Sequence, residues 1–386
     1  MKHLLLSLLV SVVGLSAQTQ SIEFRTGDFA LAISGTGQIT AMRDSTTGKD
    51  FLAPGQRAAL LRIRVADAWL EPVNITFNGA ANVMDLSYPD AKTIAQIQVT
   101  QKNTHLVFHL VKVTPAEAVT AVSWGPYPTV INKTIGEVVG VVRDGAYAIG
   151  LQSLNIKTLG GVLKNAEGTE EGRGSAAIKT GYGSSLQAYS LDRSKDRKIS
   201  VHHGQYPEVP VQPIAHETTV GSKIALFGCP DKEALGRIGE IELAEGLPHP
   251  LINGIWHKQS PETGRAYLIT DFNEANIDEL LAYARAAGLL SLYHMSPFKS
   301  WGHFGLDPRP FPNGIAGMKA CVDKAAKLGL RIGVHTLTSF INTHDPYVTP
   351  IPDKRLAVTG SSALAEPVDA AVKAVQVESK YYFTNR

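Results

Sequence analysis

The sequence predicts a β-sandwich followed by an incomplete (β/α)8 TIM barrel. From Ser21 to Phe227, short alternating apolar runs are separated by Gly, Asn, Asp and Pro, which is typical of an antiparallel sandwich. From Leu251 onward, short apolar runs alternate with amphipathic helical periods, which specifies a parallel sheet covered by helices. The composition changes between the two patterns near Cys229. We therefore expect two domains.

The first residues have the order of a secretory signal peptide. A basic Lys2 precedes an apolar run at 4–13, and small residues follow up to Ala17. No cysteine follows the expected cleavage site, so a lipid anchor is not indicated. We expect residues 1–17 to be removed and the mature chain to be secreted or periplasmic, without a membrane anchor.

Charge and cysteine content exclude some functions and leave others open. The chain has 37 basic and 35 acidic residues, a formal charge of +2, and no basic block, so nucleic acid is not an expected partner. Its two cysteines, Cys229 and Cys321, show no CxxC spacing for a metal. A disulfide between them stays open, because sequence does not place the two sulfurs together. No cofactor is expected, and the oligomeric state stays open.

The first domain is expected at 18–228, and a linker helix at 229–250. Within the sandwich, Trp124 stands among prolines and has two interpretations: an exposed platform for a sugar ring, or a plug in the core. After it, Ala234 and Ile238 lie on one face of a helical period that ends near Gly246.

Residues 251–360 predict the first three βα units of the barrel. The expected strands are Leu251–His257, Leu289–His294 and Arg331–His335, and the expected helices are Ile277–Ala287 and Ile315–Leu328. No GxGxxG follows the first strand, which argues against a dinucleotide-binding sheet.

A complete (β/α)8 barrel takes about 250 residues, more than the chain has after position 250. We therefore expect a C-terminally truncated fragment. Its last segment, 361–386, is the start of an insertion or of the next unit. A short helix is expected there at Glu366–Val375, followed by a strand-like run from Lys380 to Thr384.

Three histidines end the three expected strands: His257, His294 and His335. Parallel strands end at one edge of the sheet, which is where ligands bind in α/β folds. Three imidazoles there suit a zinc site, hydrogen bonds to sugar hydroxyls, or packing in the barrel mouth. We favour sugar binding and assign no metal, because the HxH pair common in metal-dependent barrels is absent.

The loops after the second and third strands add aromatic and carboxylate side chains of the kind that stack on sugar rings and grip hydroxyls. The candidate substrate-binding residues are Trp256, His257, His294, Trp301, Asp307, His335, Thr338, His344 and Asp345.

Two stretches resemble carbohydrate-active enzymes. The run FALAISGTGQITAMRDSTTGKDFL, from Phe29, resembles the first hairpin of the galactose-mutarotase-like supersandwich that precedes the catalytic domain in several glycoside hydrolases and polysaccharide lyases. A loop with Trp301, the run FPNG at 311–314, a helix and LGLRIGVHT are similar to the second and third barrel units of α-galactosidases and their clan.

The similarity to that clan breaks at two places. Tyr293, His294 and Met295 stand where the clan has paired aspartates that hold galactose hydroxyls, and His335 stands where it has a tryptophan. Galactose specificity therefore does not follow. The resemblance also implies that the nucleophile and the acid/base are aspartates on the fourth and sixth strands, which we expect beyond Arg386.

We therefore expect a parent enzyme that hydrolyses glycosidic bonds of a polysaccharide or oligosaccharide. By resemblance it is retaining, with two carboxylates about 5 to 5.5 Å apart, and this chain alone is inactive. A polysaccharide lyase stays open, with Tyr293 or His294 as base and Lys299 as neutraliser of a uronate. A non-catalytic glycan-binding protein that uses only the sandwich also stays open.

Overall fold

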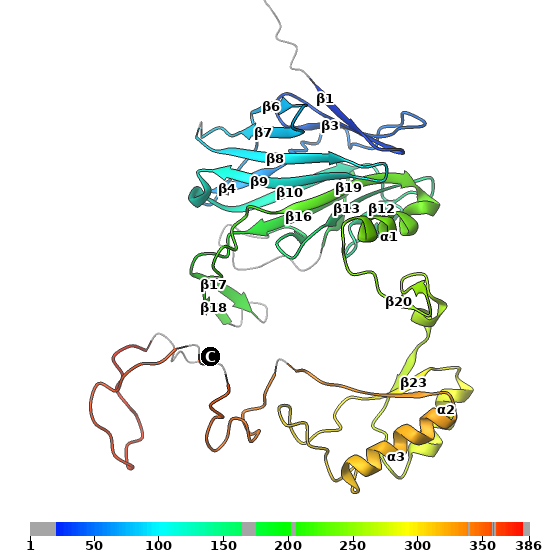
Figure 1. The fold of residues 1–386 in the computed structure, drawn as a ribbon, viewed down its shortest axis with the longest axis vertical. Helices are drawn as coiled ribbons and strands as arrows, with labels where there is room; N and C mark the ends of the chain where they lie inside the picture. Colours follow the sequence, from blue (N-terminus) through cyan, green and yellow to red (C-terminus); the bar gives the residue numbers. More distant parts are fainter. Residues whose placement is uncertain are drawn as a thin grey trace, which may run out of the picture. The chain divides into compact units, whose positions relative to one another are not determined.

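The computed structural model describes residues 21–90, 92–163, 175–201, 206–338, 340–356, 358 and 360–380. The chain forms two compact units, Met1–His249 and Pro250–Arg386, which Figure 1 draws as a ribbon with labels on many of the elements. The expected signal peptide, at 1–17, lies outside the described residues.

The first unit is built from antiparallel sheets (Figure 1). A three-stranded sheet has the order β1-β2-β3, and a six-stranded sheet the order β14-β16-β10-β4-β5 with β15 also on β16. An eight-stranded sheet runs β11-β12-β13-β19-β9-β8-β7-β6, and β17 pairs with β18. The strands are β1 (Ile22–Arg25), β2 (Phe29–Ile33), β3 (Ile39–Asp44), β4 (Arg62–Val65), β5 (Ala68–Leu70), β6 (Asn74–Asn78), β7 (Val83–Ser87), β8 (Ile94–Gln101), β9 (Leu106–Thr114), β10 (Val119–Thr129), β11 (Thr134–Gly136), β12 (Val141–Arg143), β13 (Tyr147–Ser153), β14 (Leu159–Gly160), β15 (Ala177–Thr180), β16 (Gly183–Leu191), β17 (Arg197–Val201), β18 (Tyr206–Val211) and β19 (Lys223–Pro230), with a 3-10 turn at Ala116–Ala118.

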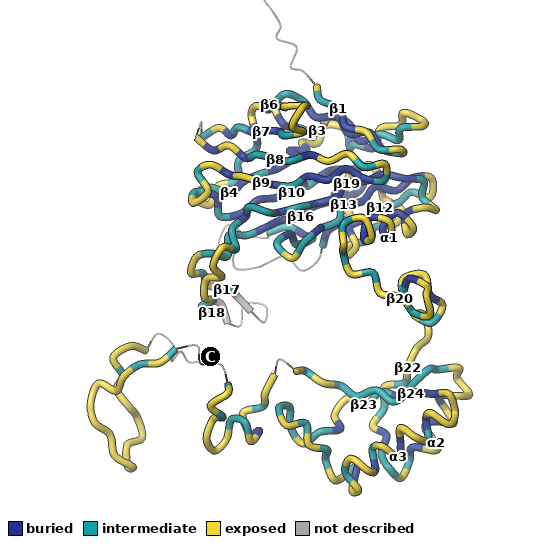
Figure 2. The backbone as a smooth tube through the Cα atoms, viewed as in Figure 1, coloured by how far each residue is buried: buried dark blue, intermediate teal, exposed yellow. Residues whose placement is uncertain are grey.

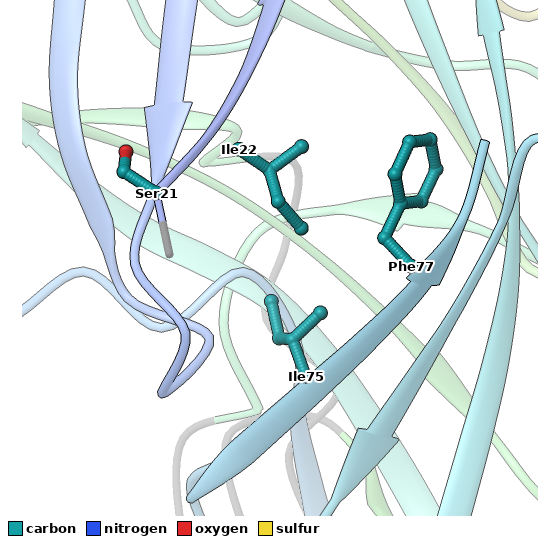
Figure 3. A pocket seen from close by; sticks show the side chains of 4 residues that line it. All are labelled: Ser21, Ile22, Ile75 and Phe77. Carbon is teal, nitrogen blue, oxygen red and sulfur yellow. The ribbon is translucent and has the colours of Figure 1, made fainter. Parts of the chain in front are cut away.

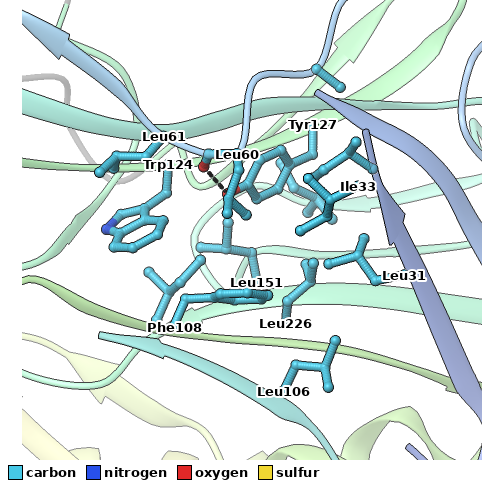
Figure 4. Packing of buried hydrophobic residues seen from close by; sticks show 14 of the residues in the cluster. Leu31, Ile33, Leu60, Leu61, Leu106, Phe108, Trp124, Tyr127, Leu151 and Leu226 are labelled. Atoms are coloured by element: carbon cyan, nitrogen blue, oxygen red, sulfur yellow. Dashed lines mark hydrogen bonds between the residues drawn. The ribbon is translucent and has the colours of Figure 1, made fainter. Parts of the chain in front are cut away.

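The three larger sheets share one apolar core. Leu31 of β2, Trp124 of β10 and Leu226 of β19 belong to the same buried cluster, and Figure 4 shows them packed together. Each fully buried apolar side chain of this size stabilises the fold by about 1.5 to 3 kcal/mol. The alternation of apolar and polar residues along these strands therefore places the core between the sheets.

Trp124 lies in this core and is fully buried. Its indole Nε1–H donates to the Ser222 hydroxyl at 2.9 Å. A buried indole needs such a partner, because an unpaired N–H in an apolar environment costs free energy. Of its two interpretations, the structure therefore supports the core plug and not the exposed sugar platform.

The expected linker helix packs on the first unit. A 3-10 turn at Asp231–Glu233 leads into α1 (Ala234–Ala244), and Arg237 donates to Asp28 Oδ2 at 2.8 Å and to the Thr104 carbonyl at 3.2 Å. Cys229 belongs to β19 and is buried as a free thiol, as is Cys321 in the second unit. The first unit therefore ends at His249 and includes α1, whereas we expected the first domain to end at 228. Ile238 and Ile241 of α1 are buried, and the helix contacts β19.

The second unit contains a parallel sheet with helices as connections. Its sheet has the order β22-β23-β24, and both strand pairs are parallel. The elements are β20 (Leu251–Ile252), β21 (Ile255–Trp256), a 3-10 turn at Pro261–Gly264, β22 (Tyr267–Ile269), α2 (Ile277–Ala286), β23 (Ser291–His294), α3 (Gly314–Lys327) and β24 (Arg331–Val334).

The first strand of this sheet is not the expected Leu251–His257. That segment folds back on itself as the antiparallel hairpin β20–β21, turning at Asn253 and Gly254, which have φ values of 52° and 80°. Asn-Gly is the dipeptide preferred in two-residue hairpin turns, since both residues tolerate positive φ. The strand that pairs with β23 is β22, which begins at Tyr267.

The helices of the second unit cover one face of its sheet. Leu292 of β23 is buried with Leu281 of α2 and Ala325 of α3, and Leu268 and Ile332 pack against the same cluster. Alternate residues of these strands point to the other face. Tyr267 and Ile269 of β22 are each 55% exposed there, and Figure 2 shows the helices exposed on their outer side.

The expected helix at Glu366–Val375 does not form. No helix or strand follows β24 among the described residues, and Val368, Val372 and Val375 are exposed. A short helix needs an apolar surface to pack on, because isolated helices of this length are marginal in water. Most of the expected strand that starts at Lys380 lies outside the described residues. Within those residues, no helix is long and apolar enough to cross a membrane.

Candidate functional site

The carboxyl edge of the parallel sheet holds the candidate site. His294 is the last residue of β23, and His335 follows β24 directly. The His335 backbone N–H donates to the His294 carbonyl at 2.8 Å, which continues the strand pairing to this edge. Asp271 follows β22 at the same edge, with its side chain 84% exposed. The structure thus brings two of the three candidate histidines together.

A chain of rings runs along this edge. Tyr293 Oη lies 2.8 Å from His335 Nδ1, a hydrogen bond between the side chains of neighbouring strands. Trp301 packs edge-on against the His335 ring with centroids 5.9 Å apart, and Tyr267 lies 5.4 Å from Tyr293. Gly333 of β24 leaves room for the Tyr293 ring, since a Cβ there would lie 2.8 Å from Tyr293 Cδ2. These residues combine apolar faces with hydrogen-bonding groups.

His294 is 3% exposed and lies among aromatic rings. Its ring is 5.1 Å from Phe272 and 5.8 Å from Phe311, and its Nδ1 accepts the Ser296 N–H at 3.1 Å. Burial lowers the pKa of His294, while the nearby Asp271 carboxylate opposes that shift. Burial therefore favours the neutral imidazole, and the ring is packed in the sheet edge more than it is presented to a ligand.

Asp345 is fully buried, and protein groups donate hydrogen bonds to its carboxylate. Its carboxylate accepts hydrogen bonds from Ser300 Oγ at 2.6 Å, His303 Nδ1 at 2.8 Å and the Tyr347 N–H at 2.9 Å. Burial on its own would raise the pKa of Asp345, but the bonds from Ser300, Tyr347 and His303 outweigh it and hold the pKa well below its usual range. We expected this carboxylate to grip sugar hydroxyls; the structure places it inside the loops, because those donors surround it.

Asp307 is held by its neighbour Arg309. The guanidinium Nε lies 3.0 Å from Asp307 Oδ2 and 3.1 Å from Oδ1, and this bond lowers the pKa of Asp307 to about 2. The Asp307 side chain is 13% exposed, whereas that of Arg309 is 88% exposed. A ligand at this point would therefore meet the guanidinium before it met the carboxylate.

Of the other candidates, Trp256 and His257 belong to the hairpin region, and Thr338 and His344 to the segment after β24. Trp256 is 5% exposed on β21, with the Lys258 ammonium 5.2 Å above its ring. His257 follows that hairpin strand and does not end a strand of the parallel sheet. Thr338 and His344 are exposed in the segment after β24. The expected row of three strand-ending histidines is therefore wrong at His257, and among the described residues no group of three His, Cys, Asp or Glu side chains could hold a metal ion.

Several residues of this edge were missed from the sequence. Asp271 follows the run YLIT, whose β-branched and aromatic residues are a strand signal that precedes it. His303, Ser300 and Asn342 join the two loops through side-chain bonds. No local sequence pattern predicts such contacts, because the two residues in each of these bonds lie about 40 positions apart.

Among the described residues, the first unit contains two hollows. One, of about 280 Å³, is lined by Ser21, Ile22, Ile75 and Phe77, and Figure 3 shows its apolar side chains facing one another. The other, of about 310 Å³, is lined by Gln152, Ser153, Asn155, Ile156, Glu242, Leu247 and Pro248. Neither includes a candidate from the sequence.

Comparison with known proteins adds a similarity of fold only. No family model matches the sequence, and no curated protein matches it. Among solved structures, the chain is similar to the α-galactosidase from Lactobacillus brevis (TM-score 0.36, 9% identity, covering 87% of this chain and 57% of that one). It is also similar to an α-galactosidase from Thermus thermophilus in complex with p-nitrophenyl α-D-galactopyranoside (TM-score 0.27, 10% identity, 85% and 51% covered). The chain thus spans about half the length of these structures.

Proposed function

We propose that the carboxyl edge of the second unit is the sugar-binding wall of a glycoside hydrolase. The observation that carries this is the contact between Tyr293, His335 and Trp301. It places an aromatic surface beside a hydrogen-bonded hydroxyl and imidazole. The C–H faces of a sugar ring pack on such a surface, and its hydroxyls exchange hydrogen bonds with groups that both donate and accept.

The proposed architecture follows from the same unit. The order β22-α2-β23-α3-β24 is the pattern with which a (β/α)8 barrel begins. The first unit, which precedes it in the sequence, is in this proposal a galactose-mutarotase-like supersandwich. In this proposal the parent protein is exported and acts on a polysaccharide or oligosaccharide. Asp307 and Asp345 are not the reacting carboxylates in this proposal, because protein donors already occupy them.

Glycan binding by the chain tests the proposal. Isothermal titration with α-galactosides, malto-oligosaccharides and oligogalacturonides should find a binder, and Trp301→Ala or His335→Ala should weaken it at least tenfold, about 1.4 kcal/mol. Trp69→Ala, on β5 of the first unit, is the matched control and should bind like the parent chain. Binding that survives both site variants, or that the residues 21–249 show alone, would place the site elsewhere.

The Tyr293–His335 hydrogen bond favours a polysaccharide lyase as the second candidate. A tyrosine that is hydrogen-bonded to an imidazole can donate its proton to that imidazole. The resulting tyrosinate can then abstract the proton on the carbon next to a uronate carboxylate. Mass spectrometry of products from the full-length parent separates the two reactions. Hydrolysis adds one water to the cleaved bond, whereas elimination adds none and leaves an unsaturated sugar.

A further inference from the structure

We propose that Asp345 is a positioning residue that ties the loop after β23 to the segment after β24, and so holds Trp301 against His335. The inference rests on the proposed sugar site, since it concerns the geometry of that wall. Asp345 is fully buried, so its part in the site is indirect. We call Asp345, Ser300, His303 and Tyr347 the loop clamp.

The clamp uses the full accepting capacity of one carboxylate. Oδ2 accepts from Ser300 Oγ at 2.6 Å and from the His303 backbone N–H at 3.1 Å. Oδ1 accepts from His303 Nδ1 at 2.8 Å and from the Tyr347 backbone N–H at 2.9 Å. An ionised carboxylate accepts at both oxygens, whereas an amide in its place would turn N–H donors toward two of these donors. Asparagine is therefore not equivalent here.

The approach of the two segments is close enough to require glycine. Gly302 has a φ of +131°, and a Cβ on it would lie 2.5 Å from Asp345 Cγ. Only glycine adopts this backbone conformation readily and leaves space for the carboxylate. The His303 ring also stacks on Tyr347 with centroids 3.8 Å apart, which adds a second contact between the same two segments.

The clamp reaches Trp301 through Asn342. The Trp301 N–H donates to Asn342 Oδ1 at 2.6 Å, and the Asn342 N–H donates to the Trp301 carbonyl at 3.0 Å. The Asp345 N–H donates in turn to the Asn342 carbonyl at 3.0 Å. The backbone of Trp301 is thus fixed by the segment after β24, and its ring contacts His335 at that strand's end. Loss of the Asp345 hydrogen bonds would therefore detach the segment after β24 from Ser300 and His303, next to Trp301.

The test measures the Trp301–His335 contact and glycan affinity in the same variants of the full chain. Nuclear Overhauser contacts between the Trp301 indole and the His335 ring should be present in the parent protein and lost in Asp345→Asn. Ser300→Ala should weaken them, and Ser300→Thr, which keeps the hydroxyl, should restore them. Asp323→Asn is the control, because that carboxylate bonds an exposed lysine on α3 and should leave the contacts unchanged.

The affinity arm uses the glycan that binds tightest among α-galactosides, malto-oligosaccharides and oligogalacturonides. Asp345→Asn should weaken it roughly tenfold, the loss expected when the Trp301 ring is no longer held against His335 at the sugar site. Persistence of the ring contacts in Asp345→Asn overturns the clamp, and lost contacts with unchanged affinity overturn its positioning role. If Asp345→Asn does not fold, the Ser300→Ala and Ser300→Thr pair decides. If the parent protein binds no glycan, the proposed function falls and the ring contacts alone decide the clamp.

Discussion

Glu245, just after α1, is the buried carboxylate that anchors this helix to the first unit. Its side chain is 3% exposed and accepts hydrogen bonds from Lys223 at 2.7 Å, from Lys102, and from the buried His105 ring at 3.3 Å. Burial acts to raise the pKa of Glu245, but the bonds from Lys102 and Lys223 outweigh it and lower the pKa from 4.5 to about 2. The charged form is therefore stabilised by folding.

This shift predicts how stability depends on pH. Because the folded pKa of Glu245 lies below the unfolded one, its contribution is fully present above about pH 4.5 and is lost as pH falls toward 2. Glu245→Gln should lower the free energy of unfolding of the first unit by about 2 to 3 kcal/mol at pH 7 and by clearly less at pH 3.5. Urea unfolding at several pH values measures both.

The control for this prediction lies on the same helix. Glu240 pairs with Arg237 at 3.1 Å with its side chain 57% exposed, so Glu240→Gln should cost less than about 1 kcal/mol. Equal losses for the two variants at every pH would contradict the role given to Glu245.

For the candidate site residues, the sequence predicts the sheet edge at which a residue lies, but it does not predict which groups the side chain contacts. His294 and His335 lie at one edge because they end consecutive parallel strands, a consequence of the βα pattern alone. Whether Asp345 faces a ligand or the protein depends on Ser300 and His303, some 40 residues earlier in the chain. Local pattern carries no information on such a bond.

At the scale of an element, α3 is capped by a carboxylate from another loop. Glu274, in the connection after β22, accepts the Asn313 N–H at 2.9 Å and the Asn313 side-chain amide at 2.7 Å. A carboxylate at a helix N-terminus is favourable because it meets free N–H groups and the positive end of the helix dipole. The Glu274 carboxylate lies against Gly317, where an added Cβ would clash with Glu274 Oε1.

Two helical glycines should therefore respond oppositely to alanine. Gly317→Ala should destabilise the second unit by about 1 kcal/mol, since the added methyl displaces the Glu274 carboxylate from the helix end. Gly236→Ala, in α1, meets nothing within 4 Å and should stabilise the first unit by about 0.5 to 1 kcal/mol, because alanine loses less backbone entropy. Urea unfolding measures both changes. Stabilisation by Gly317→Ala would show that Glu274 is not held in place.

At the scale of the whole chain, the boundary of the first unit is testable. Ile238 and Ile241 of α1 are buried in the unit that ends at His249, and Cys229 and Pro230 complete the pairing of β19 with β13. A fragment of residues 21–249 should fold. One of residues 21–228, which ends where the sequence pattern changes, should melt about 10 °C lower, since it loses several kcal/mol of burial.

Differential scanning calorimetry of the two fragments makes this comparison. Equal melting temperatures would mean that α1 is a linker after all. A 21–228 fragment that does not fold cooperatively would support the longer boundary in the same way as a lower melting temperature.

The sequence alone predicted that helices connect parallel strands in the second unit and that His294 and His335 lie at one sheet edge, because side-chain period and parallel connection are local properties. Tertiary structure decided that the first strand of the parallel sheet is β22, since residues 251–256 pair with each other through the Asn253–Gly254 turn. It also decided that Asp345 is buried between two loops. Burial and hydrogen bonding depend on residues distant in the chain, and only the folded protein brings these together.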